Sequence, residues 1–223
     1  MKYLIFDAGP IISLTMNGLL PVLRSLKKDF GGKFIITPAV KKEVIDKPLR
    51  IKKFKLEAMQ VKKLLDDGVL SPSSDIISNQ ALHKETAKIL KQVNNSLKST
   101  RTNQRIKIVH EGEASCLALS NLCGCENLIV IDERTTRVLE EAPEKLRELI
   151  ERKLRTPIEQ LSKPLPNSKA DKFVRSTELI FIAYKKGLLQ EKTKDFLDAA
   201  LFALKFKGTA ISSKEIEEIK KLA

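Results

Sequence analysis

The sequence predicts an α/β fold built on a parallel β-sheet, in one domain that spans residues 1–223. Short, wholly apolar runs alternate with longer stretches in which apolar residues recur every three or four positions. The short runs are typical of buried strands, and the longer stretches of helices with one apolar face. Strands that alternate with helices indicate a parallel sheet covered by helices. At 42% hydrophobic residues, the chain can form a real core, which few aromatics make mainly aliphatic.

Three apolar runs are the predicted strands, at residues 2–6, 34–36 and 128–131. The first run stops at Asp7, before a segment typical of a turn, and the last is followed by Asp132. Apolar spacing predicts helices between and after these strands, at residues 10–26, 38–46, 51–68, 82–97, 111–122, 146–154, 174–184, 196–206 and 214–222.

Two regions extend the α/β core. Residues 48–107 are predicted to be an inserted helical hairpin, with residues 71–74 (Ser-Pro-Ser-Ser) as the loop between its helices. Residues 143–223 are predicted to be mainly helical.

The charge of the chain favours a polyanionic partner. Lys and Arg number 41 against 28 Asp and Glu, which gives a formal charge of +13. Residues 41–107 alone carry 16 basic and 7 acidic side chains. Each neutralised phosphate of a nucleic acid releases counterions, so this stretch could be a binding surface. A basic surface without a nucleic acid partner remains the alternative.

The three cysteines, Cys116, Cys123 and Cys125, form neither a disulfide framework nor a paired zinc motif. Cys116 falls in an apolar helical stretch, where it is expected in the core. No apolar run approaches the roughly 20 residues that span a membrane, and the first residues do not resemble a signal peptide. A cytoplasmic protein without a membrane partner is therefore expected.

Four acidic residues are candidates for one site. Asp7 and Asp132 follow strands, and ligand sites of parallel sheets form outside the carboxyl ends of strands. Glu43 lies in the helix after the second strand, and Glu113 in the first turn of the helix before the third. Carboxylates gathered at one edge would repel each other unless a cation neutralised them, and Mg²⁺ and Mn²⁺ favour such oxygen ligands. A catalytic His would then be unnecessary.

Each acid also has a purely structural interpretation. Asp7 could cap a helix or form an Asx turn, and Asp132 could cap the next helix. Glu43 could pair with Lys47, and Glu113 could interact with the helix dipole. The functional interpretation therefore depends on the combination.

The combination resembles the PIN-domain family. The four segments that carry the resemblance occur in the family's order, at residues 3–13 (YLIFDAGPIIS), 36–44 (ITPAVKKEV), 111–120 (EGEASCLALS) and 130–137 (VIDERTTR). Residues 179–189, followed by two helices, also resemble the last portion of archaeal and bacterial members.

The resemblance implies a three-layer α/β/α fold and a metal-dependent endoribonuclease. Asp7, Glu43, Glu113 and Asp132 would coordinate one or two Mg²⁺ or Mn²⁺ ions and cut RNA by hydrolysis. Many members carry Asp where this chain has Glu133, so Asp132, Glu133 or both could face the metal.

The resemblance also suggests supporting residues and partners. Ser13 would hydrogen-bond a metal ligand or metal-bound water, or else be an ordinary helix hydroxyl. Arg137 would contact a substrate phosphate or pair with Glu133. Lysines of the insertion could hold the RNA backbone or simply form a solvated helix face, and these are Lys52, Lys53, Lys62 and Lys63. A homodimer is expected, and an antitoxin-like protein is a possible partner.

Other classes fit less well. A haloacid-dehalogenase-type phosphatase needs a second acid two residues after the first, where this chain has Gly9. The glycine-rich motifs of dinucleotide-binding folds and phosphate-binding loops are missing from the sequence. Two alternatives stay open: a non-catalytic PIN fold that binds RNA or protein, and the toxin of a toxin–antitoxin pair.

Overall fold

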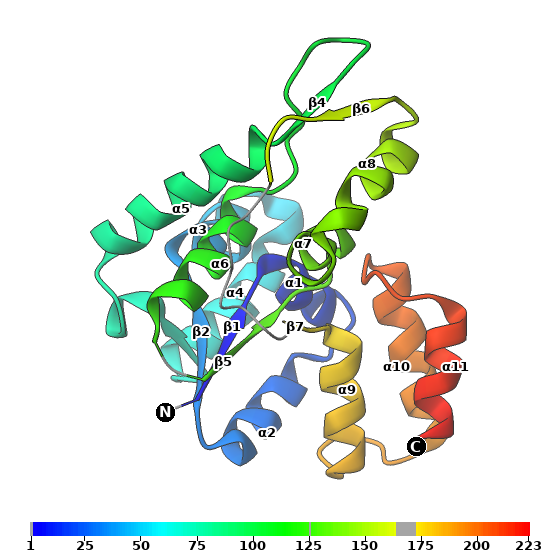
Figure 1. Ribbon diagram of the computed structural model, residues 1–223. Helices are drawn as coiled ribbons and strands as arrows, with labels where there is room; N and C mark the ends of the chain where they lie inside the picture. Colours follow the sequence, from blue (N-terminus) through cyan, green and yellow to red (C-terminus); the bar gives the residue numbers. More distant parts are fainter. Residues whose placement is uncertain (1, 125, 164–172) are drawn as a thin grey trace.

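The computed structural model describes residues 2–124, 126–163 and 173–223, and its centre is a five-stranded, all-parallel sheet flanked by helices (Figure 1). The strand order is β3-β2-β1-β5-β7. The strands are β1 (Tyr3–Phe6), β2 (Lys33–Ile36), β3 (Leu70–Pro72), β5 (Asn127–Val130) and β7 (Phe173–Val174). The predicted α/β class with a central parallel sheet is confirmed.

Helices occupy most of the remaining chain. The α-helices are α1 (Ala8–Met16), α2 (Leu20–Phe30), α3 (Pro38–Lys41), α4 (Lys55–Asp66), α5 (Asn79–Asn94), α6 (Glu111–Leu122), α7 (Arg134–Glu141), α8 (Leu146–Leu154), α9 (Ser176–Lys185), α10 (Lys194–Phe206) and α11 (Ser213–Lys221). The short helical turns are η1 (Lys42–Asp46), η2 (Pro48–Arg50), η3 (Lys52–Phe54), η4 (Ser73–Asp75) and η5 (Pro143–Lys145). The predicted helix over residues 10–26 is two helices, because Gly18 takes a left-handed φ of 68° after α1.

β1 lies at the middle of the sheet and pairs in parallel with both β2 and β5. All four of its residues are buried, as its apolar sequence predicts. From β1 the chain adds β2 and β3 on one side, then β5 and β7 on the other. Loops that leave β1 and β5 therefore diverge, and such a switch point is where parallel sheets form ligand crevices.

The prediction that residues 71–74 form a loop is wrong. Leu70–Pro72 form the edge strand β3, which pairs in parallel with β2, and Ser73–Asp75 form a helical turn. A three-residue strand is too short to show alternation, and proline is tolerated at a sheet edge because no partner needs its N–H. Residues 48–107 are thus more than a helical hairpin, since they contribute to the central sheet.

A second, two-stranded sheet joins distant segments. β4 (Leu97–Ser99) pairs antiparallel with β6 (Ile158–Gln160), which follows α8 (Figure 1). Elsewhere, α5 packs along α6, while α9, α10 and α11 pack together. Within the described ranges, no helix has the length and apolar character needed to cross a membrane.

Two of the three cysteines, Cys116 and Cys123, lie in the described ranges. Cys116 is fully buried in α6 and belongs to the hydrophobic core, as its apolar surroundings predict, while Cys123 is half-buried. Cys125 lies outside the described residues.

Candidate functional site

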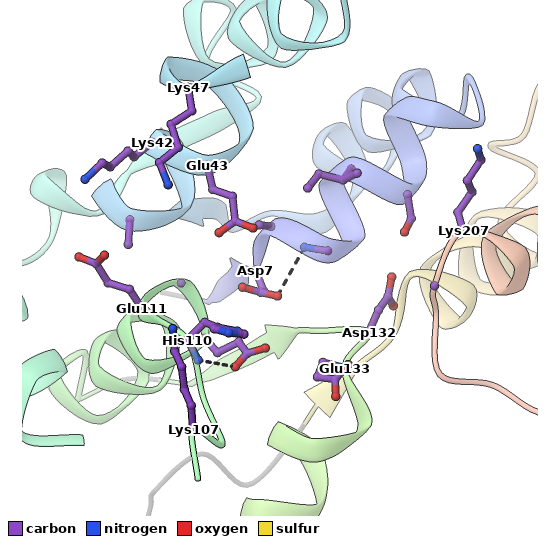
Figure 2. Close-up of a pocket in the computed structure, with 18 residues that line it drawn as sticks. Asp7, Lys42, Glu43, Lys47, Lys107, His110, Glu111, Asp132, Glu133 and Lys207 are labelled. Atoms are coloured by element: carbon purple, nitrogen blue, oxygen red, sulfur yellow. Dashed lines mark hydrogen bonds between the residues drawn. The ribbon is translucent and has the colours of Figure 1, made fainter. Parts of the chain in front are cut away.

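A cleft of about 710 Å³ lies at the carboxyl ends of β1 and β5, and the predicted acids line it (Figure 2). Its acidic residues are Asp7, Glu43, Glu111, Glu113, Asp132 and Glu133. Its basic residues are Lys42, Lys47, Lys107, His110 and Lys207. Segments from across the chain meet here, so Asp7 and Asp132 at the strand ends share one cavity with Glu43 and Glu113 of the helices.

Asp7 is the buried centre of the cleft. Its backbone N–H donates to the carbonyl of Val130 over 3.0 Å, which joins the end of β1 to β5. Its Oδ2 accepts the N–H of Gly9 over 3.4 Å and caps α1. Burial, together with the carboxylates of Glu113 and Glu43, raises the pKa of Asp7 to about 7, although backbone N–H groups act in the opposite direction. Asp7 therefore sits where negative charge is costly.

Gly112 allows Asp7 and Glu43 to come together. A Cβ at this position would lie 3.3 Å from Asp7 Oδ1 and 3.5 Å from Glu43 Oε2. Both oxygens thus border the space that a side chain would fill. Glu43 projects toward Asp7 from the π-helical turn η1 (Figure 2). Gly112, which directly precedes Glu113 in the segment 111–120, is therefore part of the site, although the sequence directed attention only to Glu113.

Glu113 lies beside this pair and has a structural role as well. Its Oε2 accepts the backbone N–H of His110 over 2.9 Å, which closes a capping box at the start of α6. Burial raises the pKa of Glu113, and the hydrogen bond from His110 opposes that effect. Glu113 therefore both caps α6 and lines the cleft.

Asp132 is buried on the opposite side of the cleft, and both of its oxygens accept hydrogen bonds. Oδ1 accepts the backbone N–H of Ser176 over 2.8 Å. Oδ2 accepts the hydroxyls of Ser176 and Thr209, over 2.8 and 3.0 Å. Burial raises the pKa of Asp132 in spite of these bonds. Asp132 thus anchors the start of α9 and the segment after α10 to the end of β5.

Glu133 begins α7, and its Oε1 is also engaged. It accepts the backbone N–H and the hydroxyl of Thr135, over 3.4 and 2.7 Å, and pairs with Lys153 over 3.1 Å. Partial burial alone would raise the pKa of Glu133, but the bonds from Thr135 and Lys153 outweigh it and lower the pKa. Both adjacent acids line the cleft, and each is held by partners within the protein.

The supporting residues differ in position. Ser13 is buried in α1 and lines the cleft. Arg137 lies outside the cleft lining and pairs with Glu141 over 3.9 Å, not with Glu133 as one interpretation had it. The insertion lysines Lys52, Lys53, Lys62 and Lys63 lie on η3 and α4 and are exposed, away from the cleft lining.

The lysines that line the cleft were not predicted from the sequence to bind RNA, and Lys47 was considered only as a partner of Glu43. Lys42 and Lys47 are within five residues of Glu43, so proximity in sequence could have indicated them. Lys107 lies four residues before the segment 111–120, so it too is near a motif in sequence. Lys207 is far from any motif, and only the folded chain brings it to the cleft.

The fit of a divalent cation is limited to one part of the cleft. Among the residues that the structure describes, no group of three or more His, Cys, Asp or Glu side chains is arranged to hold a metal ion. Asp7 and Glu43 nevertheless meet beside Gly112, with Glu113 close enough to raise the pKa of Asp7. Two or three carboxylates with added waters suit one Mg²⁺ or Mn²⁺. The oxygens of Asp132 already have partners.

Comparison of the chain with protein-family models, with curated proteins and with solved structures finds no match.

Proposed function

We propose that this protein is a metal-dependent endoribonuclease whose metal is held by Asp7, Glu43 and Glu113. The observation that carries the proposal is the buried carboxylate of Asp7, whose pKa rises to about 7 beside two other carboxylates. Strongly shifted pKa values in a cleft are typical of functional sites. The resemblance of residues 1–140 to the PIN family supports the same activity.

The acids divide into two roles in this proposal. Asp7, Glu43 and Glu113 would hold Mg²⁺ or Mn²⁺, which would activate water and stabilise the leaving oxygen. Ser13, which is buried in α1 and lines the cleft, would hydrogen-bond a metal ligand. Asp132 fixes the C-terminal segments against the floor of the cleft through Ser176 and Thr209.

Lysines of the cleft would bind the RNA backbone. Lys42 and Lys47 lie on one side with Glu43, and Lys107 and Lys207 come from two other segments (Figure 2). Together they place positive charge around the acids, where a phosphodiester would approach. The excess of basic residues over the whole chain favours the same class of ligand.

An RNA-binding protein that does not cut is the second candidate. This candidate is favoured by the hydrogen bonds that the carboxylates of Asp132 and Glu133 accept within the protein. The sequence-based prediction assigned the same carboxylates to a metal. A single cation at Asp7 and Glu43 would then be structural, or the site would bind none.

A protein partner is favoured by an apolar groove of about 340 Å³ between α1 and α4. Ile12, Met16, Ile51 and Phe54 line it with much of their surface exposed. The groove adjoins the cleft, since Ile12 and Glu43 line both. A second copy of the chain, or an antitoxin-like protein, could cover it. Light scattering would detect the homodimer as a doubled mass.

The deciding experiment uses end-labelled single-stranded RNA with Mn²⁺, Mg²⁺ or EDTA. We expect cleavage by the wild-type protein only with a metal, and a loss of at least about 100-fold in Asp7→Asn, because even outer partners of metal ligands contribute 10- to 100-fold. The matched control is Asp46→Asn, whose side chain pairs with Lys41 outside the cleft lining. Binding without cleavage under every metal would support the second candidate, and equal cleavage by both variants would exclude Asp7 from the chemistry.

A further inference from the structure

A second cavity, of about 230 Å³, opens beside the cleft between α3, α5 and α6. Its walls include Pro38 and Ala39 of α3, and Leu82 and Thr86 of α5. Ala39 and Glu111 line both this cavity and the cleft, so the two spaces are neighbours. A molecule held in the cleft can therefore place one of its groups in the smaller cavity.

The hydroxyls at the wall of this cavity already have partners. Ser115 Oγ donates to the carbonyl of Gly112 over 2.7 Å, and it lies 2.6 Å from Thr37 Oγ1. Thr37 Oγ1 in turn accepts the N–H of Val40. Thr86 Oγ1 donates to the carbonyl of Leu82 over 2.7 Å. The inner wall consequently offers mainly apolar surface to a ligand.

The polar groups of the cavity stand at its open edge. Asn79 and His83 of α5 and Glu111 of α6 are exposed there. The amide of Asn79 can both donate and accept, whereas an ionised Glu111 can only accept hydrogen bonds. An apolar slot with a few polar groups at its rim suits a flat heteroaromatic ring. Its volume, below the roughly 300–1,000 Å³ of drug-sized sites, suits a single ring system.

We propose that this cavity binds one unpaired nucleobase of the RNA strand held in the cleft, and that it selects a base with an exocyclic amino group. The inference rests on the proposed function, because the strand in the cleft brings the base to the cavity. Carboxylates accept hydrogen bonds from the amino group of cytosine, and uracil has no such donor at that position. His83 provides a ring on which a base can stack, as in proteins that bind single-stranded RNA. The substrate class is therefore single-stranded RNA with an amino-bearing base next to the bound phosphates.

The test measures binding without cleavage, by fluorescence anisotropy in Ca²⁺. The probes are oligo-C, oligo-U and an abasic strand of equal length. We expect oligo-C to bind about 5- to 100-fold more tightly than oligo-U, because one good base contact contributes about 1–3 kcal/mol. The variant Asn79→Ala/His83→Ala should lose most of this preference, and Glu111→Gln should bring the two affinities together. Gln80→Ala, which changes an exposed neighbour on α5 outside the cavity lining, is the matched control.

The outcomes distinguish failure of the base-binding proposal from failure of the nuclease proposal. Equal affinities for the three probes, unchanged in the variants, would overturn the pocket. A preference for oligo-C that the variants abolish would support it, even if Mn²⁺ produced no cleavage and the nuclease proposal failed. Absence of any RNA binding would overturn both.

Discussion

The carboxylates on the two sides of the cleft differ in their hydrogen-bond partners. On one side, Asp7 faces Glu43 beside Gly112, and its carboxylate accepts backbone N–H groups at the start of α1, such as the long bond from Gly9. On the other side, Asp132 accepts three hydrogen bonds from Ser176 and Thr209. Both carboxyls are buried, to 6% and 4% exposure. The difference thus lies in their partners and not in their burial.

Under the proposed function, this difference would separate a ligand site at Asp7 from a structural anchor at Asp132. Buried charge is costly unless it has partners, so the Asp132 side is largely satisfied by the protein itself. The carboxylate of Asp7 is less well satisfied by the protein, and a bound cation would supply the positive charge that stabilises it. Residues of a binding site that lie in an unfavourable environment commonly lower the stability of the fold, and this loss accompanies their function. The predictions below test this contrast, from the largest expected effect to the smallest.

The stability of the metal-free protein should depend on the charge of Asp7. Its folded pKa of about 7 lies above the ordinary 3.8, so between these pH values the folded state holds a proton that the unfolded state has lost. Raising the pH through this window therefore destabilises the fold, by up to about 4 kcal/mol. In EDTA, Asp7→Asn should be more stable than wild type at pH 8, and the advantage should vanish near pH 4. The difference in unfolding free energy between the two proteins is measured by urea unfolding across this pH range.

The control for this experiment is again Asp46→Asn, whose half-exposed carboxylate has a lysine partner. Addition of Mn²⁺ should raise the melting temperature of the wild type and leave that of Asp7→Asn nearly unchanged. A difference between wild type and Asp7→Asn that stayed constant with pH would contradict the contrast between the two sides.

On the other side, Thr209→Val should destabilise the protein. The change keeps the shape of the side chain but removes a hydroxyl that donates to the buried Asp132. Loss of a hydrogen bond to a charged group costs about 1–3 kcal/mol, measured as a lower urea midpoint at pH 7. Thr102→Val, at an exposed position, is the matched control. If both variants unfolded at the wild-type midpoint, Asp132 would not be an anchor.

Single lysines on each side should reveal how far RNA extends across the cleft. Lys42 accompanies Glu43, whereas Lys207 precedes the segment that holds Asp132. Each of Lys42→Ala and Lys207→Ala should reduce the slope of log affinity against log salt by about 0.7 for a single strand. Lys214→Ala, exposed on α11, should not change it. If Lys207→Ala left the slope unchanged, the RNA would contact only the Asp7 side of the cleft.

The smallest effect is expected at Arg137. Its pair with Glu141 lies outside the cleft lining and spans 3.9 Å, so it contributes little. Arg137→Ala should change unfolding free energy by less than about 0.5 kcal/mol and leave the cleavage rate nearly unchanged. A large loss of cleavage would instead restore the prediction that this side chain contacts a phosphate.

Local patterns accounted for the strand-end acids but not for their partners. Asp7 and Asp132 could be placed because apolar runs end at them, and parallel strands bring such ends to one edge. Ser176 and Thr209 could not, since they lie 44 and 77 residues beyond Asp132 and belong to no motif. Strand β3 was missed because three residues carry too little periodicity, and pairing with β2 decides its structure.

The anchoring of Asp132 also implies an order of events during synthesis. The chain emerges from its N-terminus, so Asp7 and Glu43 exist long before Thr209 is made. Until Thr209 has been added, one hydroxyl partner of Asp132 is missing, and this wall of the cleft stays incomplete. Contacts of such long sequence separation are also slow to form. A nascent chain, surrounded by ribosomal RNA and messenger RNA, would therefore complete its cleft only as its last helices fold.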